Sequence, residues 1–315
     1  MTVSRVLNGH PNIRDATRDR VLQAIQELNY TRSAIARALA TRRAMRIGVL
    51  VDSAVEYGPS STARAFERAA RAAGYAITTA TTPGEPDATV DDAAISAVSR
   101  DVDALCVIAP RASSLELVQR REAGVPTVLI TPEPHPVFAT VGVDQQLGAL
   151  LAVNHLLSLG HREIVHLGGP LDWYDARARA QGWRVAMEQA GLAPKHLAQG
   201  DWTSDSGYAF ARRMDLAKTT ALFAANDQMA LGAIHGLVDR GVSVPREMSV
   251  LGFDDVPDAR HYLPPLTTVR QDFAALGATA LEVLVESICG DIASRHAAVE
   301  PHLIERGSTG PVRPA

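Results

Sequence analysis

Cysteine is scarce in this sequence, and its scarcity limits the chemistry that the chain can hold. Only Cys106 and Cys289 occur in 315 residues, and two cysteines so far apart form neither a metal-ligand spacing nor a disulfide framework. Cys106 lies in the apolar run LCVIAP and is expected to be a small core residue. The ten histidines are scattered, and we expect His161 and His235 to be structural or exposed. The sequence thus predicts no metal site and no cofactor, and its cysteine content fits a reducing cytoplasm.

Long apolar runs and catalytic motifs are missing as well. No run approaches the length of a membrane span, and no apolar signal segment stands at the N-terminus, so we expect a cytoplasmic protein without membrane contacts. The motifs G-x-S-x-G, G-x-x-x-x-G-K-[ST], G-x-G-x-x-G and H-E-x-x-H do not occur. Asp52 and Asp254 could be imagined as the carboxylate pair of an enzyme that acts on a sugar, but no nucleophile or acid–base set supports it. We therefore expect that the chain is not an enzyme.

Charge is unevenly distributed along the chain. Eight arginines stand in residues 1–43 against Asp15, Asp19 and Glu27, a net charge of +5, whereas the whole chain carries −4. The remainder must therefore sum to −9. A small basic head on an acidic body indicates a module that binds a polyanion, attached to a second functional part.

The head contains three helical segments. TVSRVLN at residues 2–8 has apolar residues on one side and short polar or basic residues on the other, the character of a helix that reads base edges in a major groove. DATRDRVLQAIQELNY predicts a helix that starts near Asp15. RSAIARALATRR is rich in alanine and arginine, and it is either a linker helix or a hinge that orders only against a partner.

From Met45 onward, buried strands alternate with helical segments. Continuous apolar strands such as RIGVLV, DALCVIAP, VPTVLI and REIVHLGG belong to parallel sheets that are covered on both faces. The pattern runs twice, over roughly 45–143 and 160–270, and a long helix in DFAALGATALEVLVESICG and a weak strand near HLIERG follow. The sequence predicts an α/β fold with two doubly wound parallel-sheet domains facing each other across a cleft, where ligands sit at the carboxyl ends of strands.

Polar and aromatic residues stand at the ends of these strands and in the segments that follow them. Carboxylates and amides can bridge vicinal hydroxyls, an arginine adds donors, and an aromatic face packs on the apolar side of a sugar ring. The candidates are Asp52, Arg179, Trp202, Asn226, Asp227, Asp254, Asp255, Gln271 and Phe273. Because groups from several strand ends converge, we predict a sugar site in the cleft.

Structural roles compete with binding for several of these residues. Asp227 and Asp255 suit helix caps better than ligands. Trp202 suits a core anchor as well as a ligand, and Phe273 taken alone suits the core. Trp173 and Asp175 stand in the loop before the helix and suit ordinary surface. The residues for which binding is favoured are Arg179, Asn226 and Asp254.

Taken together, these motifs resemble the lactose-repressor (LacI) family of bacterial transcription factors over nearly the whole chain. TVSRVLNG is similar to the family's recognition helix, RDRVLQAIQELNY to its third headpiece helix and RSAIARALA to its hinge helix. LGHREIVHLGGP, GDW, AANDQMALGA, GFDD and PPLTTVRQDF match ordered family signatures. The resemblance implies a partial helix-turn-helix headpiece with a hinge helix over 1–43. It also implies two periplasmic-binding-protein-like subdomains, 45–159 with 273–298 and 160–270 with 299–310.

The resemblance also implies roles for single residues in the head. The implied contacts with operator DNA are Thr2, Ser4, Arg5, Asn8, Ala36 and Leu39. Arg5 would face base edges, and its polar neighbours would face bases or phosphates. Leu39, with its twofold mate, would wedge into a minor-groove step and kink the duplex.

In the core, the resemblance implies an effector site. The positions that match the family's effector-binding residues are Asp52, Arg179, Trp202, Asn226, Asp254, Gln271 and Phe273. Trp202 in its GDW context points to a galactoside or a related β-linked sugar as the small carbohydrate effector.

Two departures from the family pattern modify the expectation. About 17 residues of the family's headpiece, its first helix and turn, have no counterpart before TVSRVLNG, so we expect a poorly ordered head that results from a late start site or a shortened chain. After HLIERGSTG there is no coiled-coil-like segment of the kind that some members use to form tetramers, which favours a homodimer.

The favoured function is a sugar-responsive repressor that binds a pseudo-palindromic operator as a dimer and is released by a carbohydrate in the cleft. The alternative is a periplasmic-type sugar-binding protein without DNA binding. The sequence leaves open the identity of the effector, whether it is an inducer or a co-repressor, the operator and the regulated genes.

Overall fold

The computed structural model describes the body of the chain and a few residues of its head, namely 14, 17–18, 20–21, 23, 44–82, 96, 98–114, 124–217, 219–290 and 295–312. The chain divides into two compact units, 1–45 and 46–315. The residues described between 17 and 23 are helical, within the helix that the sequence predicts from Asp15. The expected DNA contacts all lie outside the described residues: Thr2, Ser4, Arg5, Asn8, Ala36 and Leu39.

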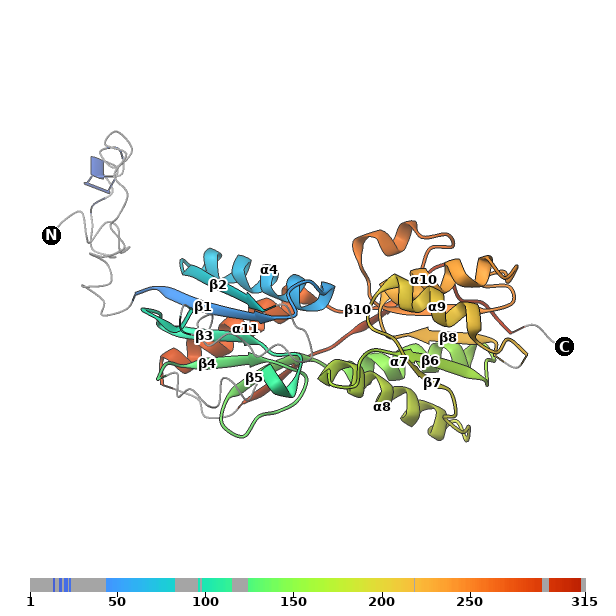
Figure 1. The fold of residues 1–315 in the computed structure, drawn as a ribbon. Helices are drawn as coiled ribbons and strands as arrows, with labels where there is room; N and C mark the ends of the chain where they lie inside the picture. The colour runs from blue at the N-terminus through green and yellow to red at the C-terminus, as the bar shows by residue number, and fades with distance from the viewer. Residues whose placement is uncertain are drawn as a thin grey trace. The chain divides into compact units, whose positions relative to one another are not determined.

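The second unit contains a six-stranded sheet with the order β11-β5-β4-β3-β1-β2 and parallel pairing throughout (Figure 1). Its strands are β1 (Arg46–Asp52), β2 (Ala76–Thr82), β3 (Ala104–Ile108), β4 (Thr127–Ile130), β5 (Ala139–Val143) and β11 (His296–Val299). Two helices cover one face of it, α4 (Tyr57–Ala72) and α11 (Phe273–Ile288). This sheet with α4 and α11 is referred to below as the first lobe.

A second six-stranded sheet has the order β12-β10-β9-β8-β6-β7, in which only the β10–β12 pair is antiparallel. Its strands are β6 (Ile164–Gly168), β7 (Leu197–Gln199), β8 (Ala221–Ala224), β9 (Ser249–Asp254), β10 (Thr267–Arg270) and β12 (His302–Ile304). Its helices are α7 (Gln145–Ser158), α8 (Tyr174–Gln189), α9 (Ser204–Arg213), α10 (Asp227–Val238) and the 3₁₀ helix η1 (Pro257–His261). This sheet with its helices is the second lobe.

Alternating burial explains why both faces of the second sheet are covered. Val165 and Leu167 of β6 pack with α10, whereas Ile164 and Phe223 pack with α7 and α8. Successive side chains of a strand point to opposite faces, so a strand that is apolar at every position needs helices on both sides. The predicted α/β architecture with two parallel sheets is confirmed, and Cys106 of β3 is fully buried as expected.

Three strands, β5, β10 and β11, are not indicated by the sequence pattern. β10 carries Thr267 and Thr268, which are fully buried but polar, and the Thr268 hydroxyl donates to Asp227. β11 lies at the edge of its sheet and is half-exposed. Neither strand contains the apolar run from which a buried strand is predicted. DDAAISAVSR (91–100) and SLELVQRREAG (114–124), for which the sequence predicts helices, fall largely outside the described residues.

Helix α7 packs with the second sheet. Its residues Ala149, Val153 and Leu156 are buried against α8 and the strands of that sheet. The boundary at residue 159 that the resemblance implies places α7 with the first lobe, since a helical pattern does not indicate which sheet the helix covers. The packing draws the lobe boundary just before Gln145 instead.

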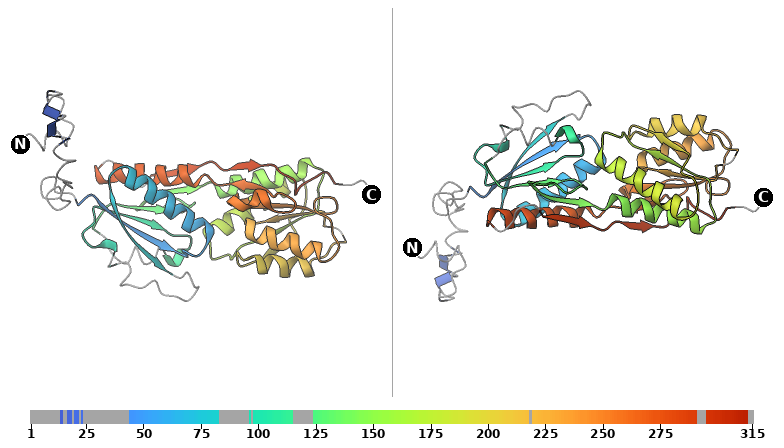
Figure 2. Two further views of the ribbon diagram at one scale, coloured as in Figure 1. Left: turned by 90° about the horizontal axis from the view of Figure 1, so that it is seen from above. Right: turned by 90° about the horizontal axis from the view of Figure 1, so that it is seen from below.

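Helices α4 and α11 lie side by side in the first lobe although they are distant in sequence (Figure 2). A Cβ at Gly277 would lie 2.6 Å from backbone atoms of Ala65 and Phe66, so the two helices approach at a residue without a side chain. The chain enters α11 directly from β10 of the other sheet. Gln271 and Phe273 therefore lie on the connection between the lobes, where the sequence predicts a crossing.

Candidate functional site

Six of the seven predicted core residues line two adjoining cavities between the lobes. The cavity on the side of the second lobe has a volume of about 30 Å³, and its lining includes Arg179, Trp202, Asn226 and Asp254. The neighbouring cavity has a volume of about 50 Å³, and its lining includes Gln271 and Phe273. Both cavities share Gly58, Pro59 and Asp175. The two are referred to together as the inter-lobe cavity.

Arg179 of α8 is the buried cation of this site, with 3 % of its surface exposed. Its Nε donates to Oε1 of Gln145 at 2.9 Å, and Nη1 donates to the carbonyl oxygen of Ala225. Its Nη2 lies 3.8 Å from a carboxylate oxygen of Asp175 and 3.7 Å from one of Asp254. Because the planar guanidinium is used in several directions at once, its orientation is fixed.

Gln271 links this cation to the end of β9. Nε2 of Gln145 donates to Oε1 of Gln271 at 2.8 Å, and Nε2 of Gln271 donates to Oδ1 of Asp254 at 2.6 Å. With the bond from Arg179 to Gln145, these contacts form a buried network that joins α7, α8, β9 and the connection into α11. A network of this kind holds its polar groups in place before any ligand arrives.

The carboxylates of the cavity are destabilised in their charged form. Burial raises the pKa of Asp254 to about 6, and the neighbouring Asp175 and Glu56 add to the shift, while Arg179 and Gln271 oppose it. Burial also raises the pKa of Asp175, against the attraction of Arg179. Burial and the charge of Asp201 raise the pKa of Glu56.

Trp202 forms an aromatic wall. Its ring lies edge-to-face against Trp173, with 5.3 Å between the ring centroids. Gly169 makes this position possible, since a Cβ there would overlap the indole of Trp202. The indole Nε1 is buried and, within the described part of the chain, has no hydrogen-bond partner. A buried N–H without a partner is costly, so this donor is available to a ligand.

Asn226 fixes the backbone of Trp202 by a hydrogen bond. Its Nδ2 donates to the carbonyl oxygen of Trp202 at 2.9 Å, and its Oδ1 accepts from the backbone N–H of Met229 at 2.9 Å. The second bond makes Asn226 the N-cap of α10. Its amide thus positions the aromatic wall and the start of a helix at the same time.

The first lobe supplies an opposite wall that is more apolar. Tyr57, at the start of α4, lies edge-to-face against Phe273 with 5.8 Å between the ring centroids. Pro59 and Thr131 line the same side. The hydroxyl of Thr131 is the second buried polar group of the cavity that lacks a hydrogen-bond partner among the described residues.

Asp52, the seventh predicted residue, lines neither cavity. Its carboxylate accepts three hydrogen bonds from Arg111, one from Thr82 at 2.7 Å and a short one from Ser114. Burial opposes its ionisation, but these hydrogen bonds outweigh burial and lower the pKa of Asp52. The resemblance implies that Asp52 contacts the effector, whereas in the structure its oxygens accept hydrogen bonds from within the first lobe.

Arg111 also joins the lobes beside the cavity. It forms an antiparallel bridge with Trp173, and the backbone N–H of Tyr174 donates to the carbonyl oxygen of Pro110 at 2.8 Å. Nη1 of Arg111 lies 3.7 Å from a carboxylate oxygen of Asp172.

Cavities of about 30 and 50 Å³ hold a few water molecules. A sugar therefore requires the lobes to part or the side chains to shift.

Sequence reasoning missed several residues of the site. Glu56 and Tyr57 follow the end of β1, and Thr131 follows β4 directly. Because ligands sit at the carboxyl ends of parallel strands, all three could have been predicted from the sequence. Trp173 and Asp175 were assigned to ordinary surface, but Trp173 is 7 % exposed and both line the cavity. Both residues follow β6, in the loop and first turn that lead into α8, the helix that carries Arg179. That position after a strand end is the sequence feature that indicates them.

The sequence favours helix caps for Asp227 and Asp255, but neither residue caps a described helix, and both carboxylates are bonded within the second lobe instead. The carboxylate of Asp227 accepts from the Thr268 hydroxyl and from the backbone N–H of Val256. Asp255 forms one ion pair with Arg270, at 2.7 Å, and another with Arg306. Both carboxylates therefore tie the end of β9 to its surroundings.

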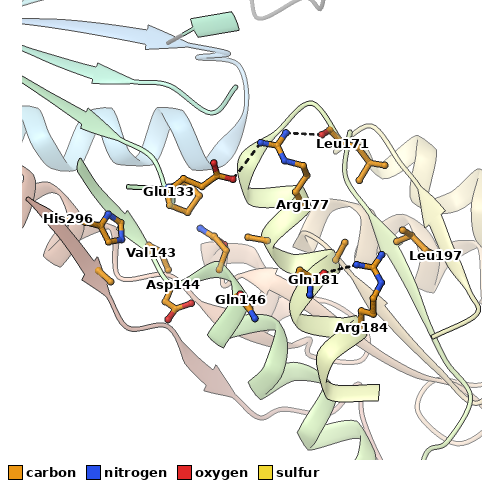
Figure 3. Close-up of a pocket in the computed structure, with 15 residues that line it drawn as sticks. Glu133, Val143, Asp144, Gln146, Leu171, Arg177, Gln181, Arg184, Leu197 and His296 are labelled. Atoms are coloured by element: carbon orange, nitrogen blue, oxygen red, sulfur yellow. Dashed lines mark hydrogen bonds and ion pairs between the residues drawn. The ribbon is translucent and has the colours of Figure 1, made fainter. Parts of the chain in front are cut away.

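A larger concavity of about 620 Å³ lies between α8, the start of α7, and strands β5 and β11 (Figure 3). In it, Arg177 reaches across to Glu133 of the first lobe at 3.6 Å, and Arg184 donates to Gln181. Its lining contains none of the seven predicted residues and no Trp, Tyr or Phe. Since sugar sites depend on such rings, the inter-lobe cavity is the better candidate despite its smaller volume.

Within the ranges that the structure describes, no three His, Cys, Asp or Glu side chains are arranged to hold a metal ion. No helix in those ranges combines the length and the apolar character needed to cross a bilayer. His161 is buried and hydrogen-bonded to Thr220 and Ser249, and His235 is exposed, as predicted.

Comparisons with known proteins connect the head and the core. Residues 1–33 match the model of bacterial regulatory proteins of the lacI family, and residues 153–309 match the periplasmic binding protein-like domain. The lactose operon repressor of Escherichia coli (strain K12) is 30% identical over 311 residues, which cover 98% of this chain and 86% of that protein. The match at the head favours a regulator over the periplasmic-type binding protein that the sequence left open.

Solved structures agree with this assignment. The crystal structure of the lac repressor dimer bound to operator and the anti-inducer ONPF matches with a TM-score of 0.81 and 30% identity, covering 98% of this chain and 94% of that one. A complex of the transcriptional regulator CelR with cellobiose matches with a TM-score of 0.74 and 29% identity, covering 97% and 94%. The chain therefore belongs to the LacI family of transcriptional regulators, which pair a DNA-binding head with an effector-binding domain and are not enzymes.

Proposed function

We propose that this chain is a sugar-responsive repressor that binds a pseudo-palindromic operator as a homodimer and releases it when a carbohydrate occupies the inter-lobe cavity. The observation that carries the proposal is the convergence of carboxylate, amide, guanidinium and indole groups around that cavity. These groups suit a ring with hydroxyls on its edge and C–H bonds on its face. A relative seen in complex with cellobiose supports a carbohydrate effector, and galactosides and related β-linked sugars are the first to test.

The proposed mechanism follows from the size of the cavity. The cavity is too small for a sugar as it stands, so either the lobes part or the side chains shift, and we propose that the lobes part. A bound sugar then shifts the equilibrium between the two lobe arrangements by its difference in affinity for them. In a dimer, that shift moves the two hinge segments apart. Leu39 and the same residue of the second copy then leave the minor groove, and so does the neighbouring Ala36. The head also loses its major-groove contacts, which are those of Thr2, Ser4, Arg5 and Asn8.

A homodimer is supported by the surface of α10. Leu231 and Val238 are 38 % and 56 % exposed, and their spacing of seven residues puts them on the same side of the helix. Exposed apolar side chains that gather on one helix face suit a contact with a second copy. Two copies are also what a pseudo-palindromic operator requires.

The test measures operator release. An operator is selected from a random duplex pool, and its affinity is followed by fluorescence anisotropy while saccharides are added. We expect at least one saccharide to weaken operator binding tenfold or more. Arg179→Lys should weaken that saccharide's binding tenfold or more while operator affinity without sugar is retained, because a lysine cannot donate in the directions that the guanidinium uses. Arg184→Lys, on the same helix but in the larger concavity, is the matched control. Failure of every saccharide to change operator affinity would refute the proposal.

A further inference from the structure

The inter-lobe cavity contains more negative than positive charge. Three carboxylates line its smaller part, those of Glu56, Asp175 and Asp254, against the single guanidinium of Arg179. Arg179 lies 3.8 Å from one of them and 3.7 Å from another, and it is almost fully buried. One cation cannot compensate three acids, so the fully ionised set carries a net charge of −2.

The described parts of the protein do not supply the missing positive charge. Within the described residues, the carboxylate of Glu56 has neither a hydrogen bond nor an ion pair, and Asp175 has only the contact with Arg179. The nearby Arg111 is committed to Asp52. The same residues form no metal-binding cluster, so a metal ion does not account for the acids either.

Independent features of the cavity point to a ligand. Trp202 is 7 % exposed, its indole lines the cavity, and its N–H has no partner in the described chain. Trp173 and Tyr57 add further aromatic surface to the same small volume. A site that combines aromatic rings with carboxylates favours a ligand with a cationic group. The ring faces attract the positive charge of the ligand, and the carboxylates neutralise that charge.

We propose that the effector is an amino sugar, a carbohydrate with a free protonated amino group that binds to the carboxylates of Glu56 and Asp175. The hydroxyls of the same sugar contact Asp254 and its amide partner Gln271, and the indole N–H of Trp202 donates to a ring or hydroxyl oxygen. This inference rests on the proposed function, since it specifies the class of carbohydrate that the inter-lobe cavity takes.

A neutral sugar fits the charge of the cavity less well. Hydroxyl donors satisfy the lone pairs of a carboxylate but leave its charge uncompensated, and a charge that is partly withdrawn from water without an opposite charge is costly. The raised pKa of Asp254, to about 6, reflects this cost in the protein itself. An ammonium group removes the cost, whereas an N-acetylated amino group does not.

The experiment uses matched trios of sugars with the full chain. Glucose, glucosamine and N-acetylglucosamine form one trio, galactose and mannose with their amino and N-acetylamino forms give two more, and affinity is measured by calorimetry near neutral pH. In at least one trio we expect the free amine to bind tenfold or more tightly than both companions. Spermidine serves as a cation that is not a sugar.

Two variants and a control locate the amine. Glu56→Gln and Asp175→Asn should each reduce the preference for the amine over its neutral companion about tenfold, whereas Glu188→Gln, an exposed acid on the same helix as Asp175, should leave it unchanged. Neutral or N-acetylated sugars that bind as tightly as the amines and release operator would overturn this inference and leave the proposed function intact. Binding of spermidine but no amino sugar would also overturn it. Absence of binding by every saccharide would overturn both.

Discussion

Asp254 is 5 % exposed and has a φ of 107°, in the left-handed part of backbone space. Burial and its acidic neighbours raise its pKa from the ordinary 3.8 to about 6. Between those values the folded protein binds more protons than the unfolded chain, so this residue makes stability fall as pH rises. Its penalty is absent well below pH 3.8 and fully present above about pH 6. Asp254 thus lowers stability at neutral pH in a site where a charged acceptor is useful.

The substitution Asp254→Asn removes that penalty. It should raise the free energy of unfolding at high pH by about 1–2 kcal/mol, less than the roughly 3 kcal/mol of a two-unit shift, because Arg179 loses an ionic partner. Asparagine also tolerates a positive φ. Denaturant unfolding of both proteins across the pH range measures the effect, which should vanish at acidic pH. A variant that is less stable than wild type at high pH would contradict this account of the site.

Single residues of the site were predictable where a strand end marks them, and less so elsewhere. Asn226 stands just after a strand and lines the cavity, whereas Asp52, at an equally clear strand end, is paired with Arg111. Arg179 also lines the cavity, but it lies within the helix that follows β6. No local pattern announces that an arginine 59 positions further along will pair with Asp52. Trp173 was missed for a similar reason, because its burial depends on Trp202 and on Gly169 leaving room.

At the scale of elements, the contact between α4 and α11 shapes the first lobe. Their close approach depends on Gly277, where a Cβ would lie 2.6 Å from the backbone of Ala65 and Phe66. Backbone atoms cannot turn aside as a side chain can, so the helices would have to separate. Because α11 begins at Phe273, which lines the inter-lobe cavity, its position also matters for the site.

Gly277→Ala should therefore destabilise the protein, although alanine is the better helix former. The gain of about 1 kcal/mol in helix propensity is smaller than the overpacking cost, and we expect a net loss of about 1–3 kcal/mol in denaturant unfolding. Ala278→Leu, which adds bulk at the exposed neighbouring position, should change stability by less than about 0.5 kcal/mol. An unchanged or higher stability of the alanine variant would show that the helices adjust freely.

The elements were predictable to the extent that their burial is apolar. β1, β3 and β4 are continuous apolar runs and were recognised, whereas β10 is buried but rich in threonine. α7 packs against the second sheet, whereas the boundary that the resemblance implies places its residues with the first, because those residues do not encode which lobe covers them. Long-range pairing and lobe membership are tertiary properties that a local pattern does not contain.

At the scale of the whole molecule, the head and the body carry opposite charge. Residues 1–43 sum to +5 and the remainder to −9, so binding to DNA should depend on the head and on counterion release. In a dimer with two such heads, operator affinity should fall roughly 10³-fold between 50 and 200 mM salt. Anisotropy titrations at several salt concentrations measure the slope. A nearly flat dependence would mean that the arginines of the head do not contact phosphates.

The lobes connect the two functions of the chain. Arg111 and Trp173 join them beside the inter-lobe cavity, and Gln271 lies on a connection between them. A ligand that changes their arrangement is therefore in a position to change the spacing of two heads in a dimer. Energetic coupling of this kind is reciprocal, so each ligand must alter the affinity of the other by the same factor.

The most direct test of the account is the affinity of the effector sugar measured by calorimetry twice, on the free protein and on protein saturated with operator. We expect operator to weaken sugar binding by the same factor by which sugar weakens operator binding, and that factor should be tenfold or more. Equal sugar affinity in the two titrations would contradict the claim that the inter-lobe cavity controls the DNA-binding head.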